Sequence, residues 1–221
     1  MHLPSTAAAL SIFTLPFIPW AGAQPTQRSL QTQEVAVFVD PRDGNVYRTV
    51  QLGSQIWLGE NIRFETEDSW VYEREAANAA RFGRLYDWEG ALGACPPGWR
   101  LPTASEWTQL FNHVGGLEMA GGNLKEAGTK HWTEPNTGAT NVSQFSGLPG
   151  GARRNPAGAF HGLGMFGAFW SSTEQSTMTA WAFFLGYHYA SVSPRASTEK
   201  NYGFSVRCVT ASATPQNRGR R

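Results

Sequence analysis

The alternation of apolar and polar residues predicts strands at the start of the domain. Residues 34–40 (EVAVFVD) form an apolar run that ends at the turn sequence PRDG. Residues 45–53 (NVYRTVQLG) and 54–62 (SQIWLGENI) then alternate apolar and polar positions on either side of Gly53-Ser54. Such alternation is typical of half-buried strands, and a short turn between two of them favours a hairpin. We therefore expect a β-meander.

Helical spacing follows over residues 73–92. Two stretches, residues 73–81 (EREAANAAR) and 84–92 (RLYDWEGAL), predict helical pieces that are separated by Gly83. Apolar residues that recur at intervals of three and four indicate a face that packs on the core. In the second stretch this predicted face consists of Leu85, Trp88, Ala91 and Leu92.

The clearest helix signal lies at residues 103–116. Thr103 is a good N-cap, and Glu106 three residues later completes a capping box. Gly115-Gly116 predicts the end of the helix. Between these signals one apolar face is expected to join the core, formed by Trp107, Leu110, Phe111 and Val114.

The remainder of the chain predicts loops followed by strands. Residues 115–168 are rich in Gly, Asn and Pro and have little periodicity, so we expect a long loop region. Three apolar segments after it predict the closing strands: FWSST (169–173), TAWAFFLGYHYASVS (179–193) and GFSVRCVT (203–210). The order of strands, helices, loops and strands predicts an α+β fold.

The N-terminal residues predict export. Residues 7–20 form an apolar stretch, and Ala21-Gly22-Ala23 fits the small-residue cleavage pattern of a signal peptide. The stretch is short for a membrane span and contains two prolines, so we expect no transmembrane segment. The predicted organisation is therefore a signal peptide (1–23), a linker (24–34), one domain (35–211) and a basic polar tail (212–221), in a secreted or cell-surface protein.

Charge and cysteine content narrow the function. The chain has a net charge of +1 and 16% charged residues, so nucleic acid is not expected as a partner. Export favours a disulfide between the two cysteines, Cys95 and Cys208, although two buried free thiols are the alternative. Neither cysteine has a second Cys or a His at ligand spacing, so no metal site is expected there.

Five blocks in order resemble one known family, the Fibrobacter succinogenes major paralogous domain. The blocks are GNVYRTVQLGSQIWLGENI, GRLYDWEGALGACPPGWRLPTASEW, NTGATNVSQFSGLPGGAR, FWSST and GFSVRCV, within residues 37–209. The resemblance implies an exported bacterial protein with a C-type lectin-like fold. That fold would have two main helices, a mixed antiparallel sheet and a long Gly/Asn-rich loop region. A disulfide from a helix near the start to the last strand would match Cys95 and Cys208.

Two other functions suggested by local motifs lack the residues they need. Glu134-Pro135-Asn136 resembles half of the site of calcium-dependent lectins, but calcium needs several carboxylates and the last Asp of the chain is Asp87. LPTASEW resembles a segment of formylglycine-generating enzymes, which use two nearby cysteines, whereas this chain has only Cys208 in its C-terminal part. We therefore assign no catalytic residue, metal or cofactor, and expect Glu134-Pro135-Asn136 to form a turn.

The expected function is non-enzymatic binding of a protein or glycan at the cell surface. Tyr, Trp, His and Arg on exposed strands and loops are the residue types that anchor binding surfaces. The alternative is that these aromatic residues fill the core. The layout also resembles ligand-binding proteins diversified by retroelements, which is a further hypothesis. The predicted ligand-binding residues are Trp181, Phe184, Tyr187, His188, Tyr189, Ser191, Arg195 and Tyr202.

Overall fold

The computed structural model describes residues 36–154, 158–193 and 196–211. The predicted signal peptide, linker and basic tail lie outside the described residues. The helices are the 3₁₀-helix η1 (Tyr72–Arg74), α1 (Ala76–Phe82), α2 (Trp88–Ala94), α3 (Ala104–His113) and α4 (Leu117–Leu124). The strands are β1 (Val37–Val39), β2 (Val46–Leu52), β3 (Gln55–Leu58), β4 (Ser69–Trp70), β5 (Leu85–Tyr86), β6 (Ala152–Arg153), β7 (Phe160–His161), β8 (Phe166–Glu174), β9 (Thr179–Gly186), β10 (Ala196–Glu199), β11 (Phe204–Ser205) and β12 (Val209–Ala211).

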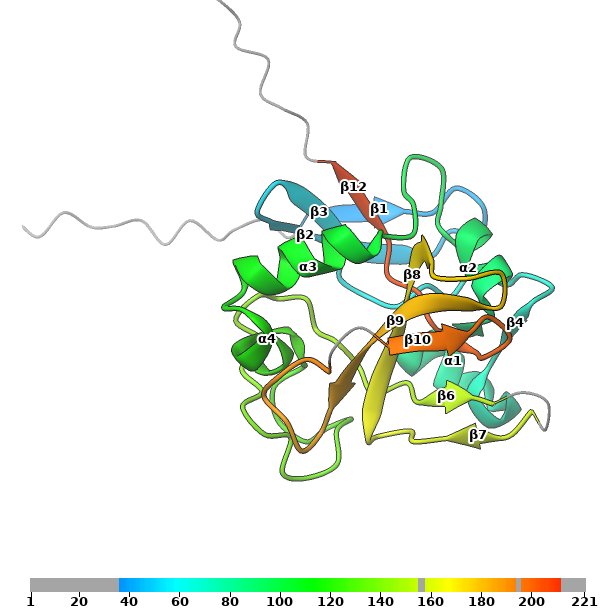
Figure 1. Ribbon diagram of the computed structural model, residues 1–221. Coiled ribbons are helices and arrows are strands. Elements are labelled where there is room, and N and C mark those ends of the chain that lie inside the picture. The colour runs from blue at the N-terminus through cyan, green and yellow to red at the C-terminus, as the bar shows by residue number, and fades with distance from the viewer. Residues whose placement is uncertain (1–35, 155–157, 194–195, 212–221) are drawn as a thin grey trace, which may run out of the picture. The chain divides into compact units, whose positions relative to one another are not determined.

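Two larger sheets and a small hairpin confirm the α+β class (Figure 1). An antiparallel sheet has the order β1-β2-β3-β12, so the expected meander is extended by the last strand, with Val209 opposite Trp57. A six-stranded sheet has the order β10-β9-β8-β11-β5-β4 and is mixed, because β11 runs parallel to β8. Strands β6 and β7 pair separately. The beginning and end of the domain therefore meet in one sheet.

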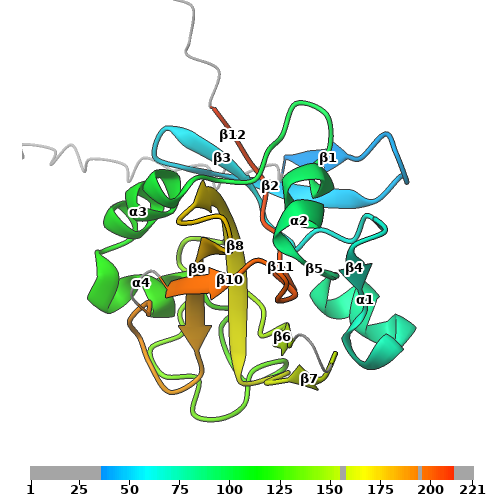
Figure 2. The same ribbon diagram turned by 45° about the vertical axis from the view of Figure 1, so that its right-hand side comes forward.

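The central strands β8 and β9 are covered on both faces. Figure 2 shows α3 and α4 on one side of these strands and α1 and α2 on the other. Alternation along β9 directs Phe183 toward α3, where its ring lies 5.2 Å from that of Phe111. Phe184, which was expected to face solvent, is half-buried instead, with its ring centroid 5.4 Å from that of Phe204. The prediction failed because the opposite face of the sheet is also packed.

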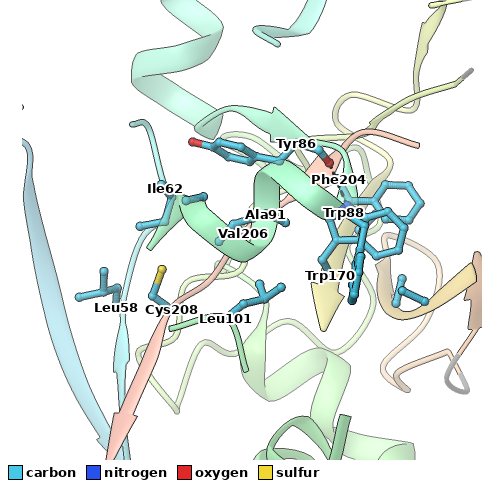
Figure 3. Close-up of a cluster of buried hydrophobic side chains, with 14 of the residues drawn as sticks. Leu58, Ile62, Tyr86, Trp88, Ala91, Leu101, Trp170, Phe204, Val206 and Cys208 are labelled. Atoms are coloured by element: carbon cyan, nitrogen blue, oxygen red, sulfur yellow. Dashed lines mark hydrogen bonds between the residues drawn. The ribbon is translucent and has the colours of Figure 1, made fainter. Parts of the chain in front are cut away.

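An aromatic cluster and the disulfide lie in the same part of the core (Figure 3). The ring centroids of Trp170 and Phe204 lie 4.6 Å apart, and the indole N–H of Trp170 donates to the carbonyl of Tyr86 at 2.8 Å. Cys208, which is fully buried in this cluster, is bonded to Cys95 at the end of α2. The expected disulfide is therefore confirmed, and the chain has no free cysteine.

Helix α3 confirms the capping prediction. The Thr103 hydroxyl accepts from the Glu106 backbone N–H at 3.2 Å, and the Glu106 carboxylate accepts from the Thr103 backbone N–H at 2.9 Å. Arg100 donates to the same carboxylate, with one N–O distance of 2.7 Å. Burial raises the pKa of Glu106, but hydrogen bonds from Arg100 and Thr103 outweigh it and hold the pKa below its usual range. The apolar face of α3 packs as expected, with Trp107, Leu110 and Phe111 buried.

Two local predictions need correction in the helical part of the chain. The second helical piece begins only at Trp88, because Asp87 caps α2 by accepting from the Gly90 N–H at 2.8 Å, and Leu85 belongs to strand β5. Leu92, which was placed on the buried face, is 42% exposed. The described chain also has four α-helices rather than two main ones.

The region predicted as a long loop contains a helix, α4, and the strands β6 and β7. Helix α4 buries two glycines where other helices bury side chains. A Cβ atom at Gly121 would lie 2.3 Å from the carbonyl oxygen of Ser191, and one at Gly122 would lie 2.2 Å from that of Gly138. Apolar periodicity could not predict this helix, because its packing face is formed largely by backbone.

A buried arginine, Arg207, holds the loop around Phe145 and Ser146 to the core. The side chain of Arg207 is fully buried, and it donates to the Asn61 side-chain oxygen at 2.7 Å and to the carbonyls of Phe145 and Ser146 at 2.6 and 2.9 Å. The guanidinium also stacks 4.2 Å from the ring centroid of Phe145. Burial lowers the pKa of Arg207, but a guanidinium remains charged at neutral pH. The Arg207 side chain thus holds the carbonyls of Phe145 and Ser146 against the core.

Candidate ligand-binding site

The structure divides the predicted ligand-binding residues among several places. Four of them occupy the segment that follows β9, residues 187–193, which we call the 187–193 turn: Tyr187, His188, Tyr189 and Ser191. Phe184 and Tyr202 are half-buried against Phe204, and the carbonyl of Phe184 accepts from the N–H of Ser193 in the turn at 3.1 Å. Trp181 is half-buried on the opposite face of β9, in the cluster with α3. Arg195 lies outside the described residues.

The 187–193 turn presents aromatic side chains to solvent. Tyr189 is 64% exposed, and His188 is exposed beside it. The ring of Tyr187 is half-buried and stacks on His188, with centroids 3.6 Å apart. The Tyr187 ring therefore packs against the His188 ring, whereas His188 and Tyr189 are the side chains that a ligand could contact.

Main-chain hydrogen bonds from other elements fix the 187–193 turn. The N–H of Tyr187 donates to the carbonyl of Met165 at 3.0 Å, and the N–H of Val192 donates to that of Leu117 at 2.9 Å. The carbonyl of Ala190 accepts from the N–H of Gly122 at 2.7 Å. These partners come from the β7–β8 connection and from α4. The turn is thus a defined surface rather than a free loop.

A buried lysine lies beneath the turn. Lys125 is fully buried at the end of α4, and its ammonium donates to the carbonyls of Thr137, Gly186 and Tyr189 at 3.0, 2.9 and 2.9 Å. Loss of hydration on burial lowers the pKa of Lys125 to about 8. Sequence analysis did not single out Lys125, because nothing in the pattern around it distinguishes a buried lysine from a solvated one.

Exposed apolar side chains lie on the elements that hydrogen-bond to the turn, and Glu118 of α4 is an exposed charged residue among them. The elements bonded to it expose Leu117 (49%), Met119 (56%) and Met165 (44%). The adjoining loop exposes Val142 (71%). Residues 135–146 and 186–193 contain no Asp, Glu, Lys or Arg. Depletion of charge together with exposed Tyr and Met is the composition found at the centre of protein–protein interfaces.

Comparison with known proteins identifies the family. Residues 50–210 match the Fibrobacter succinogenes major domain (Fib_succ_major), which is well over half of the chain. The chain belongs to this family. A comparison with curated proteins found no match. The matched span runs from β2 to β12 and includes α3, α4 and the 187–193 turn, so the resemblance carried by the five sequence blocks is confirmed.

In this member of the Fibrobacter succinogenes major domain family, Glu134-Pro135-Asn136 forms a turn whose Glu134-Pro135 bond is cis. Glu134 is exposed, whereas Asn136 is 5% exposed and points inward. Its side-chain amide donates to the carbonyls of Glu126 and Gly128 at 2.9 and 2.7 Å. Among the residues the structure describes, no three His, Cys, Asp or Glu side chains gather closely enough to hold a metal ion. By these two hydrogen bonds the amide of Asn136 ties the turn to residues 126–128.

Two hollows on the described surface lie along α3, away from the turn. The larger, of about 480 Å³, is lined in part by Arg100, Glu106 and Gln109, and the smaller, of about 300 Å³, by Gln55, Gln109 and His113. Arg100 and Glu106 are already paired with each other. Neither hollow contains a residue of the 187–193 turn.

None of the helices in the described part of the chain has the length and apolar composition that a membrane crossing needs.

Proposed function

We propose that this family member is an exported, non-enzymatic binding module that recognises a protein ligand through the 187–193 turn. The observation that carries the proposal is the presentation of Tyr189 and His188 on a turn whose backbone is fastened by neighbouring elements. The partly apolar surroundings, with few charged residues, favour a protein surface as the ligand. A glycan is the second candidate, because an exposed tyrosine ring such as that of Tyr189 can also stack on a sugar.

We further propose that the domain has the C-type lectin-like form of the α+β class. Support comes from the pairing of the last strand, β12, with β3 near the start of the domain. The disulfide from the end of α2 to Cys208, just before β12, also fits that form. The long connection between α4 and β8, which carries the Gly/Asn-rich loops, corresponds to the long loop region of that fold.

The disulfide and the N-terminal sequence support export, and the disulfide and Asn136 argue against two other functions. A disulfide and a signal-peptide-like N-terminus fit a secreted or cell-surface protein. An enzyme of the formylglycine-generating type would need reactive thiols, and both cysteines are bonded to each other. A calcium-dependent lectin would need an accessible Asn136 side-chain oxygen as a ligand, but Asn136 is only 5% exposed and its amide nitrogen ties the side chain to the carbonyls of Glu126 and Gly128.

Diversification of the turn by a retroelement extends the same proposal. No hydrogen bond from the side chains of His188, Tyr189 or Ser191 is found within the described residues, so the turn's conformation tolerates changes there. A near-identical copy of the 3′ coding end that differs at adenines, beside a reverse transcriptase gene, would support diversification. A locus with neither would refute it.

A binding screen with matched variants tests the function. The full exported chain is offered to arrays of cell-surface proteins and of glycans, with and without EDTA. We expect a protein ligand whose affinity falls at least ~30-fold, or about 2 kcal/mol, in the His188→Ala/Tyr189→Ala double variant. Met178→Ala is the control, because Met178 is 68% exposed outside the turn.

Each outcome has a definite meaning. Binding that is lost in the double variant and kept in Met178→Ala supports the proposal, and a glycan that behaves this way establishes the second candidate. A ligand whose affinity is unchanged in the double variant refutes the turn as the site. Loss of binding on adding EDTA would restore the calcium-dependent alternative.

A further inference from the structure

The 187–193 turn is held by main-chain hydrogen bonds and by the side chain of Val192, which is buried in the core cluster that contains α3. Carbonyls at Tyr187 and Ala190 accept from the N–H groups of Thr137 and Gly122, at 2.8 and 2.7 Å. The contacts of the exposed side chains are ring contacts within the turn, between His188 and its two tyrosine neighbours. The backbone conformation of the turn is therefore set by neighbouring segments, and the exposed side chains remain free to contact a ligand.

Lys125 joins the turn to two other segments. Its three acceptors belong to the long loop (Thr137), to the end of β9 (Gly186) and to the turn itself (Tyr189). An ammonium has three donors, so each proton has one carbonyl acceptor. The charge also lies 5.4 Å from the ring centroid of Trp132. No other described side chain donates to carbonyls of all three segments.

Filling the space at position 125 does not by itself require a lysine. A methionine of similar length would fill the same space without the cost of removing an ammonium from water. What a methionine cannot do is hold three carbonyl oxygens together. Carbonyls that converge on one point repel each other unless a donor or cation lies between them. The presence of a lysine at position 125 is therefore explained by its ability to hold these three carbonyl oxygens together.

We propose that Lys125 is the positioning residue of the 187–193 turn. Its ammonium draws the carbonyls of Gly186 and Tyr189 toward that of Thr137, and this fixes the backbone that presents His188 and Tyr189. The proposal rests on the proposed function for its biological meaning. Its test needs no ligand, so its failure and the failure of the proposed function can be told apart.

Amide hydrogen exchange in a Lys125→Met variant provides the test. We expect the N–H groups of Thr137, Gly122 and Val192 to exchange about 10–100-fold faster, the change that one charge-assisted hydrogen bond corresponds to. Amides of α3 serve as the internal reference and should keep their rates. The matched control is Lys130→Met, because Lys130 is exposed and only five residues away. Unchanged exchange at the turn, or equal acceleration in α3, would overturn the proposal.

A second measurement uses the wild-type protein and does not depend on how a variant folds. The chain has three lysines, Lys125, Lys130 and Lys200, so ¹⁵N labelling of lysine side chains gives few signals to assign. We expect the ammonium protons of Lys125 to exchange with water far more slowly than those of Lys130, at the rate at which the turn opens. If the two ammonium groups exchange equally fast, Lys125 does not hold the turn.

Discussion

Removing the disulfide between Cys95 and Cys208 tests how the last strand is held. The bond joins residues 113 apart in sequence, and the loop that it closes includes α3, α4 and the 187–193 turn. In the chain-entropy treatment, a loop of this length restricts the unfolded chain by roughly 5 kcal/mol at 25 °C. Measured values are often smaller, so a Cys95→Ala/Cys208→Ala double variant should lose about 2–5 kcal/mol of unfolding free energy.

Urea unfolding followed by tryptophan fluorescence measures this loss, because Trp170 and Trp88 lie in the same core cluster as Cys208 (Figure 3). Reducing the wild-type protein should reproduce the effect of the double variant. Thiol titration of the exported protein in denaturant should find no reactive thiol. Two reactive thiols, or a double variant that unfolds at the same urea concentration with the same slope, would refute the reasoning and reopen the enzymatic alternative.

Two further variants test the charged groups. Arg207→Met should lower the unfolding free energy by about 3–5 kcal/mol in urea titrations, because it leaves several buried acceptors without a donor, at about 1–3 kcal/mol each. The exposed control Arg81→Met should stay within about 0.5 kcal/mol, and an equal loss in both would contradict the buried role. Glu106 has a lowered pKa, so the stability that it contributes is present above its unfolded pKa and is lost as the pH falls through its folded pKa. Between about pH 5 and pH 3, Glu106→Gln should therefore lose less unfolding free energy than the wild type, and parallel pH profiles would be inconsistent with the Arg100–Glu106 pairing.

The blocks that carry the family resemblance lie mostly in the framework of the domain. They cover the meander, α2, the start of α3, part of the long loop and the core strands. The candidate contact residues, His188 and Tyr189, follow β9 on a turn between two such blocks. Under the proposed function, a member of this family would keep its core and change its ligand by altering a few exposed side chains.

Predictions from local sequence succeeded where the deciding contacts are local. The capping box of α3 needs only Thr103 and Glu106, three residues apart, and the hairpin at Gly53-Ser54 needs only its flanking alternation. Helix α4 was missed because Gly121 and Gly122 pack through their backbone. The exposure expected for Phe184 was wrong because a strand pattern does not reveal whether its second face is covered.

The sequence by itself determined the α+β class, the family and the aromatic character of the segment after β9, and it favoured a disulfide between Cys95 and Cys208 over two free thiols. These features depend on composition, on short-range spacing and on ordered motifs. Only the tertiary structure decided which aromatic side chains reach solvent and which cations are buried. Lys125 and Arg207 became structural anchors because carbonyls 12 to 149 residues away in sequence converge on their side chains, including those of Thr137, Tyr189, Leu58 and Phe145. Convergence of this kind is a property of the folded chain, and no local pattern encodes it.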